Sequence, residues 1–168
     1  MKSIRLVVTI LLAASVANLS LMIPGGTVET REFTQYSTLV LASFNIFLTC
    51  LGFGSLAASY FVYKQNKGYL ISVLLGVAYL AVYISDLAQI FPVSQNPMSA
   101  TLARMEWIGS ILGAALTAAA IFALRGTKGE SASFQKPKLP FMAKISLTII
   151  AAIIVIYATI SAMGYHPL

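Results

Sequence analysis

The stretch that decides the fold spans residues 38–91 and reads TLVLASFNIFLTCLGFGSLAASYFVYKQNKGYLISVLLGVAYLAVYISDLAQIF. It consists of two long apolar runs separated by the short basic segment Lys64-Gln65-Asn66-Lys67-Gly68. A helix of about 20 mostly apolar residues is long enough to cross the hydrocarbon core of a bilayer. A connection this short makes the two helices antiparallel neighbours. The stretch therefore predicts a transmembrane hairpin with helices over 38–63 and 69–91.

Three further apolar runs flank this hairpin, at 4–23, 102–124 and 145–163. Five spans with short connections take up nearly all of the 168 residues, so we predict an all-α integral membrane bundle that forms a single domain over 1–168. The segment 125–144 contains two prolines and is expected to be a polar cytoplasmic loop. The first run begins like a secretory signal, but it exceeds the usual length of a signal's apolar region, so we expect a retained anchor.

The basic residues predict the orientation in the membrane. Only Arg31 and Arg104 lie in segments assigned to the outer side. The other nine of the eleven are Lys2, Arg5, Lys64, Lys67, Arg125, Lys128, Lys136, Lys138 and Lys144, all on one predicted side. Because Lys and Arg accumulate in cytoplasmic loops, we expect a cytoplasmic N-terminus and an external C-terminus.

Composition indicates the environment and the class of partner. The chain is 58% hydrophobic and 10% charged, whereas a soluble domain is about one quarter charged. The net charge of +6 comes from loops beside apolar runs, without interleaved stacking aromatics. Membrane lipids are therefore the expected partner rather than nucleic acid. We expect a multi-pass protein of a bacterial-type inner (plasma) membrane.

Small residues recur at helical spacing in the second, third and fourth predicted spans. Because helix association in lipid depends on close packing, we expect Gly52, Gly76, Gly109 and Gly113 at helix interfaces. Gly109 and Gly113 form a GxxxG motif, which fits packing within the monomer as well as dimerisation. The predicted faces are Asn45, Thr49, Gly52, Leu56 and Ser59, then Ser72, Gly76, Tyr79, Tyr83 and Asp86, then Glu106, Gly109, Gly113, Thr117 and Ala120. We expect these spans to form the core and the first and fifth to face lipid.

Asp86 is the first candidate for a site, because a carboxylate inside a span costs about 2.5–3.5 kcal/mol near the membrane centre. It precedes Pro92 by six residues, which places it roughly 9 Å inside the end of its helix. We expect a polar cluster at the outer mouth of the bundle. Its predicted members are Asn18, Glu32, Asn45, Tyr83, Asp86, Arg104 and Glu106.

Three interpretations of this cluster remain open. The first is a structural network in which Asn45, Tyr83 or Arg104 satisfies Asp86. The second is a cation or proton site that uses Asp86 and Glu106, with Glu32 as a further candidate member. The third is a site that faces a partner protein or a pigment. The nearby loop with Glu29, Arg31 and Glu32 is either a solvated loop or a lid over Asp86 and Glu106, with Arg31 or Arg104 providing ion pairs.

The sequence offers little for catalysis or for a cofactor. His166 is the single histidine and Cys50 the single cysteine, so we predict no histidine-held haem, no internal disulfide and no metal site. Neither a catalytic triad nor a phosphate-binding glycine loop is present. We therefore predict a protein that is not an enzyme, although acid–base chemistry by Asp86 and Glu106 is a third hypothesis.

Two hypotheses about function follow. The first is a non-enzymatic bundle that acts by association, as an accessory or assembly subunit of a larger membrane complex or as a homo-oligomer. The second is a small channel or transporter whose acidic outer vestibule is built around Asp86, Asn45 and Glu106.

Overall fold

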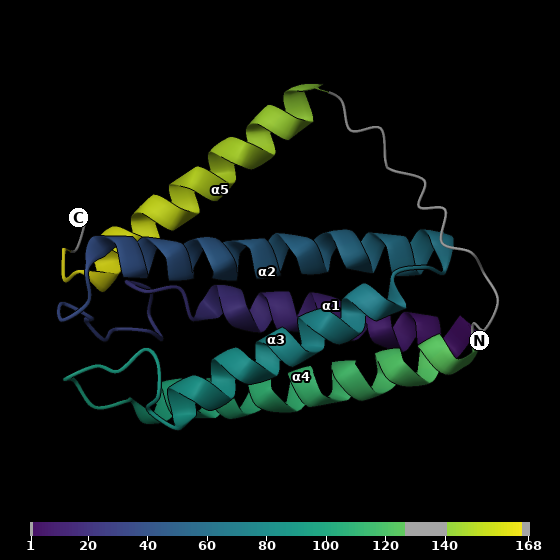
Figure 1. Cartoon of the computed structure of the whole chain (residues 1–168), viewed down its shortest axis with the longest axis horizontal. Helices are drawn as coiled ribbons and strands as arrows, with labels where there is room; N and C mark the ends of the chain where they lie inside the picture. The colour runs from purple at the N-terminus through teal and green to yellow at the C-terminus, as the bar shows by residue number, and fades with distance from the viewer. Residues whose placement is uncertain (1, 127–140, 166–168) are drawn as a thin grey trace.

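The computed structural model describes residues 2–126 and 141–165, and these residues fold into five helices (Figure 1). Each of the five contains a stretch long and apolar enough to cross a membrane. The predictions of an all-α bundle and of a multi-pass membrane protein are confirmed. Residues 127–140 of the predicted polar loop, and His166, lie outside the described residues. The helices are α1 Lys2–Leu21, α2 Thr38–Gln65, α3 Tyr69–Leu87, α4 Ala100–Gly126 and α5 Phe141–Ala162.

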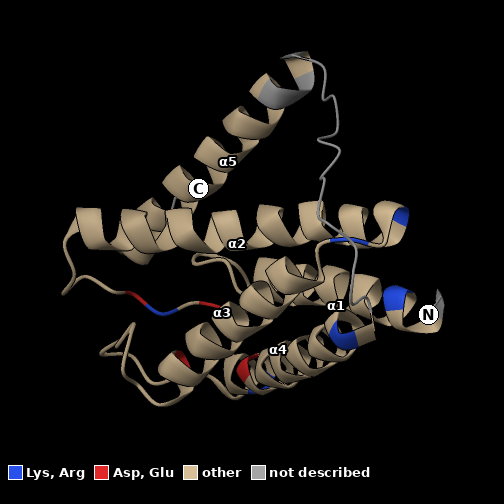
Figure 2. Ribbon diagram, turned by 45° about the vertical axis from the view of Figure 1, so that its right-hand side comes forward, with Lys and Arg blue, Asp and Glu red and all other residues tan. Residues whose placement is uncertain are grey.

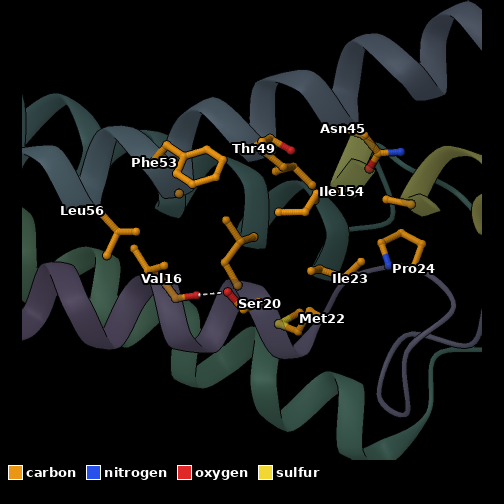
Figure 3. Close-up of a pocket in the computed structure, with 14 residues that line it drawn as sticks. Val16, Ser20, Met22, Ile23, Pro24, Asn45, Thr49, Phe53, Leu56 and Ile154 are labelled. Atoms are coloured by element: carbon orange, nitrogen blue, oxygen red, sulfur yellow. Dashed lines mark hydrogen bonds between the residues drawn. The ribbon is translucent and has the colours of Figure 1, made fainter. Parts of the chain in front are cut away.

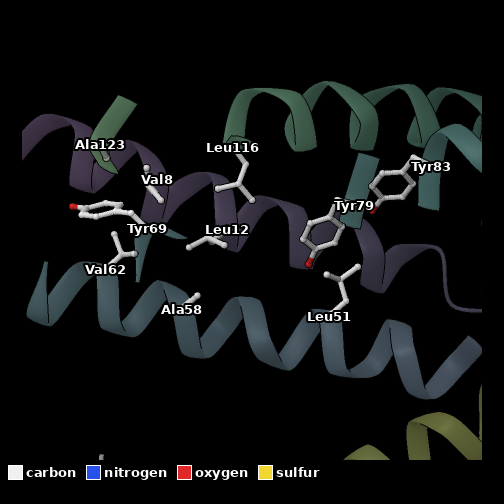
Figure 4. Close-up of a cluster of buried hydrophobic side chains, with 10 residues drawn as sticks. All are labelled: Val8, Leu12, Leu51, Ala58, Val62, Tyr69, Tyr79, Tyr83, Leu116 and Ala123. Carbon is white, nitrogen blue, oxygen red and sulfur yellow. The ribbon is translucent and has the colours of Figure 1, made fainter. Parts of the chain in front are cut away.

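Helices α1 to α4 form the body of the molecule, and α1 lies inside it rather than at its edge. It packs against both α2 and α4. Val8 and Leu12 on α1 have no exposed surface. Figure 4 shows these two side chains between α2 and α4, together with Leu51 and Leu116. The first span was expected to lie more against lipid, and the structure bears this out for one face only. Val8, Leu12, Ser15 and Asn18 are buried inside the bundle, whereas Leu6 and Ile10 are exposed.

The seam between α3 and α4 is close-packed through glycines. A Cβ atom built on Gly109 would lie 2.3 Å from Cε2 of Tyr83, and one on Gly76 would lie 2.9 Å from the backbone N of Thr117. A Cβ on Gly113 would lie 3.1 Å from the carbonyl oxygen of Gly76. The GxxxG motif is therefore covered by α3 of the same chain, and its glycine face is not free for a second copy.

The buried face of α3 is the face predicted from the sequence, but that of α2 is rotated. On α3, the residues Ser72, Gly76, Tyr79, Tyr83 and Asp86 are all buried, together with Tyr69. On α2 the buried residues are Leu41, Asn45, Leu51, Ser55, Ala58 and Val62. Of the predicted α2 face only Asn45 belongs to this set. Leu56 is exposed and Gly52 is in ordinary contact with Leu19, 3.9 Å from its built Cβ.

Helix α5 leaves the bundle at an angle (Figure 1). Over the described residues, α2 is the one helix against which it packs. The two helices meet near the C-terminal end of α5, where Ala158 and Ala162 are buried. The expectation that the fifth span faces lipid on most sides agrees with this geometry, since six consecutive residues, 145–150, are exposed.

The charged residues lie at the two ends of the bundle (Figure 2). We call one the basic end, which holds the start of α1, the α2–α3 loop and the end of α4, with Lys2, Arg5, Lys64, Lys67 and Arg125. The other is the acidic end, which holds the α1–α2 loop, the end of α3 and the start of α4, with Glu29, Arg31, Glu32, Asp86, Arg104 and Glu106. This separation accords with the predicted orientation, in which the basic end faces the cytoplasm.

Candidate functional site

The candidate site lies at the acidic end and begins with the way α3 terminates. Gln89 adopts a left-handed backbone with φ 52°. The N–H groups of Gln89 and Ile90 donate to the carbonyls of Asp86 and Ser85, at 2.9 and 2.8 Å. These two bonds form a Schellman motif, which ends the helix and satisfies its last carbonyls. The helix therefore ends at Leu87 rather than at residue 91, and Asp86 lies in its last turn instead of roughly 9 Å inside it.

Arg31 from the α1–α2 loop binds Asp86 with both terminal nitrogens. Nη1 donates to Oδ1 at 3.0 Å and Nη2 donates to Oδ2 at 2.6 Å. On its other edge Arg31 binds Glu29, with Nε 3.0 Å from Oε1 and Nη2 2.6 Å from Oε2. The backbone N–H of Arg31 also donates to Oε1 of Glu29 at 3.0 Å. Bidentate hydrogen bonds of this kind fix the orientation of the guanidinium and also pair its charge.

These three residues are more than nine-tenths buried: Glu29 is 5%, Arg31 6% and Asp86 5% exposed. Burial by itself lowers the pKa of the Arg31 guanidinium, but its hydrogen bonds to Glu29 and Asp86 raise it further, so that the net pKa lies above its ordinary value. Arg31 is therefore held in its charged form. A solvated loop does not describe this geometry. The loop is folded into the bundle, as in the lid interpretation.

Glu106 on α4 reaches the same place from the opposite side. Glu106 is 3% exposed and lines one small cavity with Glu29, Arg31 and Asp86. Its Oε2 atom is buried and has no hydrogen-bond partner among the described residues. Three carboxylates and one guanidinium thus share one buried cluster, which we call the Arg31 cluster: Glu29, Arg31, Asp86 and Glu106.

Asn18 and Tyr83 form a neutral layer below this cluster. The amide nitrogen of Asn18 donates to the Tyr83 hydroxyl at 3.2 Å and to the carbonyl oxygen of Met105 at 3.2 Å. Tyr83 stacks on Tyr79, with ring centroids 6.1 Å apart. Asn18 therefore ties α1 to both α3 and α4, which is a structural role.

Asn45 lies on the α2 side and binds α5. Its amide nitrogen donates to Oγ1 of Thr159 at 3.2 Å. Asn45 also borders a small cavity of about 50 Å³ with Asp86, Glu106 and Arg31. One buried water occupies roughly 10–15 Å³ measured in this way, so the cavity has room for a few water-sized groups.

The remaining predicted members do not join the Arg31 cluster. Arg104 is exposed, because a step of two residues from Glu106 turns it to the opposite face of α4. The carboxylate of Glu32 lies beside Gly164, with Oε2 3.0 Å from that residue's built Cβ. The sequence therefore placed Asp86 and Glu106 together and offered Arg31 as one of two ion-pair partners. It put Glu32 in the cluster, where the structure has Glu29.

A second, larger cavity lies between α1, α2 and α5 (Figure 3). Its volume is about 160 Å³ and its lining is mostly apolar, including Val16, Phe53 and Ile154. Its polar groups are already engaged in part: the Ser20 hydroxyl donates to the carbonyl of Val16 at 2.9 Å. A cavity of this composition suits hydrocarbon, such as a lipid chain, better than a polar substrate.

Metal binding finds no support in residues 2–126 and 141–165, where no three His, Cys, Asp or Glu side chains converge as ligands. The carboxylates of Glu29 and Asp86 instead bind the Arg31 guanidinium. The arrangement holds several ionisable groups out of water.

Residues 4–134 match a family described as a domain of unknown function (DUF8051). The chain belongs to this family. The matched residues include α1 to α4 almost completely and end before α5. No curated protein and no solved structure matches the chain.

Proposed function

We propose that this protein acts by association in a bacterial-type plasma membrane, as a non-enzymatic accessory or assembly subunit. In this proposal α5 is an arm that receives a transmembrane helix of another protein. The observation that carries it is the exposure of residues 145–150. Six consecutive residues make more than one helical turn, so every side of α5 is exposed over this run.

Among the described residues, the contacts that anchor the arm lie toward its C-terminal end. Near the acidic end, the N–H of Phe33 donates to the Ala162 carbonyl at 2.8 Å, and the Tyr157 hydroxyl donates to the Gly25 carbonyl at 3.1 Å. Toward its N-terminus α5 diverges from α2 (Figure 1). A helix held in this way gains little close packing from its own chain, and close packing is what stabilises helices in lipid. A partner helix beside α5 and α2 would supply it.

Cross-linking tests this proposal. Cys50 is free and exposed, so it is first replaced by alanine. A cysteine is then placed at Ile149 on the arm, and in a control variant at Ile111 on α4. These side chains are 53% and 66% exposed. We expect a lipid-soluble cross-linker in native membranes to give a discrete adduct from I149C and little from I111C.

The mass of that adduct identifies the occupant. An adduct of twice the 18.0 kDa chain mass would assign a second copy, and any other mass a different subunit. Equal adducts at both positions, or an I149C protein that stays monomeric in native membranes, would remove the proposal.

Transport of a small cation is a second candidate, because Asn45, Asp86 and Glu106 line one cavity. Arg31 lines it as well, so a passing cation would have to displace a guanidinium from two carboxylates. Flux into liposomes containing only this protein tests the idea. Flux that Glu106→Gln alters would support transport, and an absence of flux from the wild-type protein would rule it out.

A further inference from the structure

We propose that Glu106 is a proton-binding site, in which its carboxyl carries one exchangeable proton and donates it in a hydrogen bond to Asp86. This goes beyond the association function, which needs no titrating group. It rests on the contacts within the Arg31 cluster, on the unpaired Oε2 atom and on the cavity beside it.

The charges do not balance when every member of the cluster is ionised. Glu29, Asp86 and Glu106 are three carboxylates, and Arg31 is the one guanidinium that contacts any of them among the described residues. Two negative charges would remain in a buried position. Uncompensated buried charge is avoided in proteins by pairing or by taking up a proton. One proton removes half of this excess.

Asp86 and Glu106 line the same small cavity, and the difference between their partners places the proton. Ionised carboxylates only accept hydrogen bonds, so two of them can bond one another only when one is protonated. Asp86 accepts two hydrogen bonds from Arg31 and is ion-paired with it. Glu106 receives none from Arg31. The proton therefore belongs on Glu106.

The unpaired oxygen supports the same assignment. If Oε1 of Glu106 carries the hydrogen and bonds Asp86, then Oε2 is a neutral carbonyl oxygen. A buried neutral acceptor without a partner is far less costly than a buried carboxylate oxygen without one. Binding takes a proton from water and leaves a neutral acid, and release returns it through the cavity of about 50 Å³.

The elements packed around Glu106 carry few other charged or titratable groups. The α1–α2 loop contributes Glu29 and Arg31, α3 contributes Tyr83 and Asp86, α1 and α2 contribute the neutral amides of Asn18 and Asn45, and α5 contributes Ala162. Among these, Tyr83 already accepts a hydrogen bond from Asn18. None of them provides a second cation to Glu106.

Infrared spectroscopy of the purified protein in lipid nanodiscs tests the proposal without any substitution. Asp86 is the single aspartate of the chain, so ¹³C labelling of aspartate reports on it alone. We expect a protonated-carboxyl band at neutral pH that shifts when glutamate is labelled, that does not shift when aspartate is labelled, and that disappears at alkaline pH.

Two variants assign the band. Glu106→Gln keeps a donor toward Asp86, so it should fold, lose the band and lose less thermal stability than the wild type between neutral and alkaline pH. Glu32→Gln is the control and should keep the band. A wild-type spectrum without a labelled-glutamate band, or one that Glu106→Gln leaves intact, would overturn the proposal. Loss of the band on adding sodium chloride, but not choline chloride, would also overturn it in favour of a metal cation.

The result is independent of the association proposal. The spectra are recorded on the protein alone, whereas the cross-linking experiment depends on the native membrane. Either proposal can therefore fail while the other stands.

Discussion

Where α3 meets α4, glycines bring the two backbones together along the length of the helices, whereas α5 touches α2 mainly near the acidic end. The first seam has built-Cβ distances of 2.3 to 3.1 Å at Gly76, Gly109 and Gly113. The second relies on single polar contacts, such as that between Asn45 and Thr159. The family match, residues 4–134, includes the first seam and ends before α5. Helices α1 to α4 thus form a rigid body, and α5 is an arm attached to it.

The largest expected effect lies at the acidic end of the rigid body. Arg31→Met removes the cation from a buried cluster and leaves Glu29 and Asp86 unpaired. Loss of one partner from a buried ion pair costs about 3–5 kcal/mol. We expect a loss of this size in the free energy of unfolding, measured by denaturant titration in mild detergent.

The exposed Arg104 provides the matched control. Arg104→Met removes the same charge from the same end of the molecule and should change stability little. Equal losses for the two variants would mean that the net charge of the acidic end, rather than the Arg31 pairing, sets stability.

The next effect concerns the α3–α4 seam. Gly109→Leu drives a side chain into the buried ring of Tyr83, and overpacking of this kind costs about 3 kcal/mol. Circular dichroism should show that a smaller fraction of Gly109→Leu than of the wild-type protein remains folded after heating. Gly126→Leu is the control, since nothing lies within 4 Å of the Cβ position there. A tolerated Gly109→Leu would show that α3 and α4 can separate.

A smaller and more local effect is expected where the α1–α2 loop meets α5. Gly25 has φ 82°, and a Cβ there would lie 2.4 Å from Oγ of Ser161. Gly25→Ala should cost about 1–2 kcal/mol, within the range for a strained backbone position. Hydrogen exchange should rise in residues 157–162 but not in α3 or α4. Uniformly faster exchange would contradict the division into body and arm.

The smallest effect is expected at the hydrogen bond between α2 and α5. Thr159→Val removes the acceptor for Asn45 with little change in shape. Inter-helix hydrogen bonds in membranes average about 0.6 kcal/mol, so unfolding should shift only slightly. A loss comparable to that of Gly109→Leu would mean that the arm is part of the rigid body.

The sequence was sufficient for local features of the fold. Apolar length located five spans, and helical spacing gave the buried face of α3 from Ser72 to Asp86. It was insufficient for α2, because small polar residues such as Thr49 and Ser59 resemble interface residues wherever they lie. It was also insufficient for α1, since Leu and Val suit lipid and protein interiors equally in a membrane.

The site was predictable to a similar extent. Asp86 and Glu106 were placed in one cluster from their depth alone. Arg31 was one of two candidate partners, and nothing in a single sequence chooses between it and Arg104. Because α3 ends at Leu87, Asp86 lies within reach of the α1–α2 loop, and its partner is therefore Arg31. Gln89, which ends the helix with φ 52°, is neither Gly nor Asn, the residues that usually adopt this conformation, so the helix end at Leu87 is not predictable from the residue type.

The Arg31 pairing also imposes an order on assembly. Arg31 precedes Asp86 by 55 residues in the chain, so during synthesis the α1–α2 loop is made before its partner helix exists. Until α3 is made, Glu29, two residues away, is the one of its two carboxylate partners that is present. The bundle can therefore close at this end only after its third helix has been made.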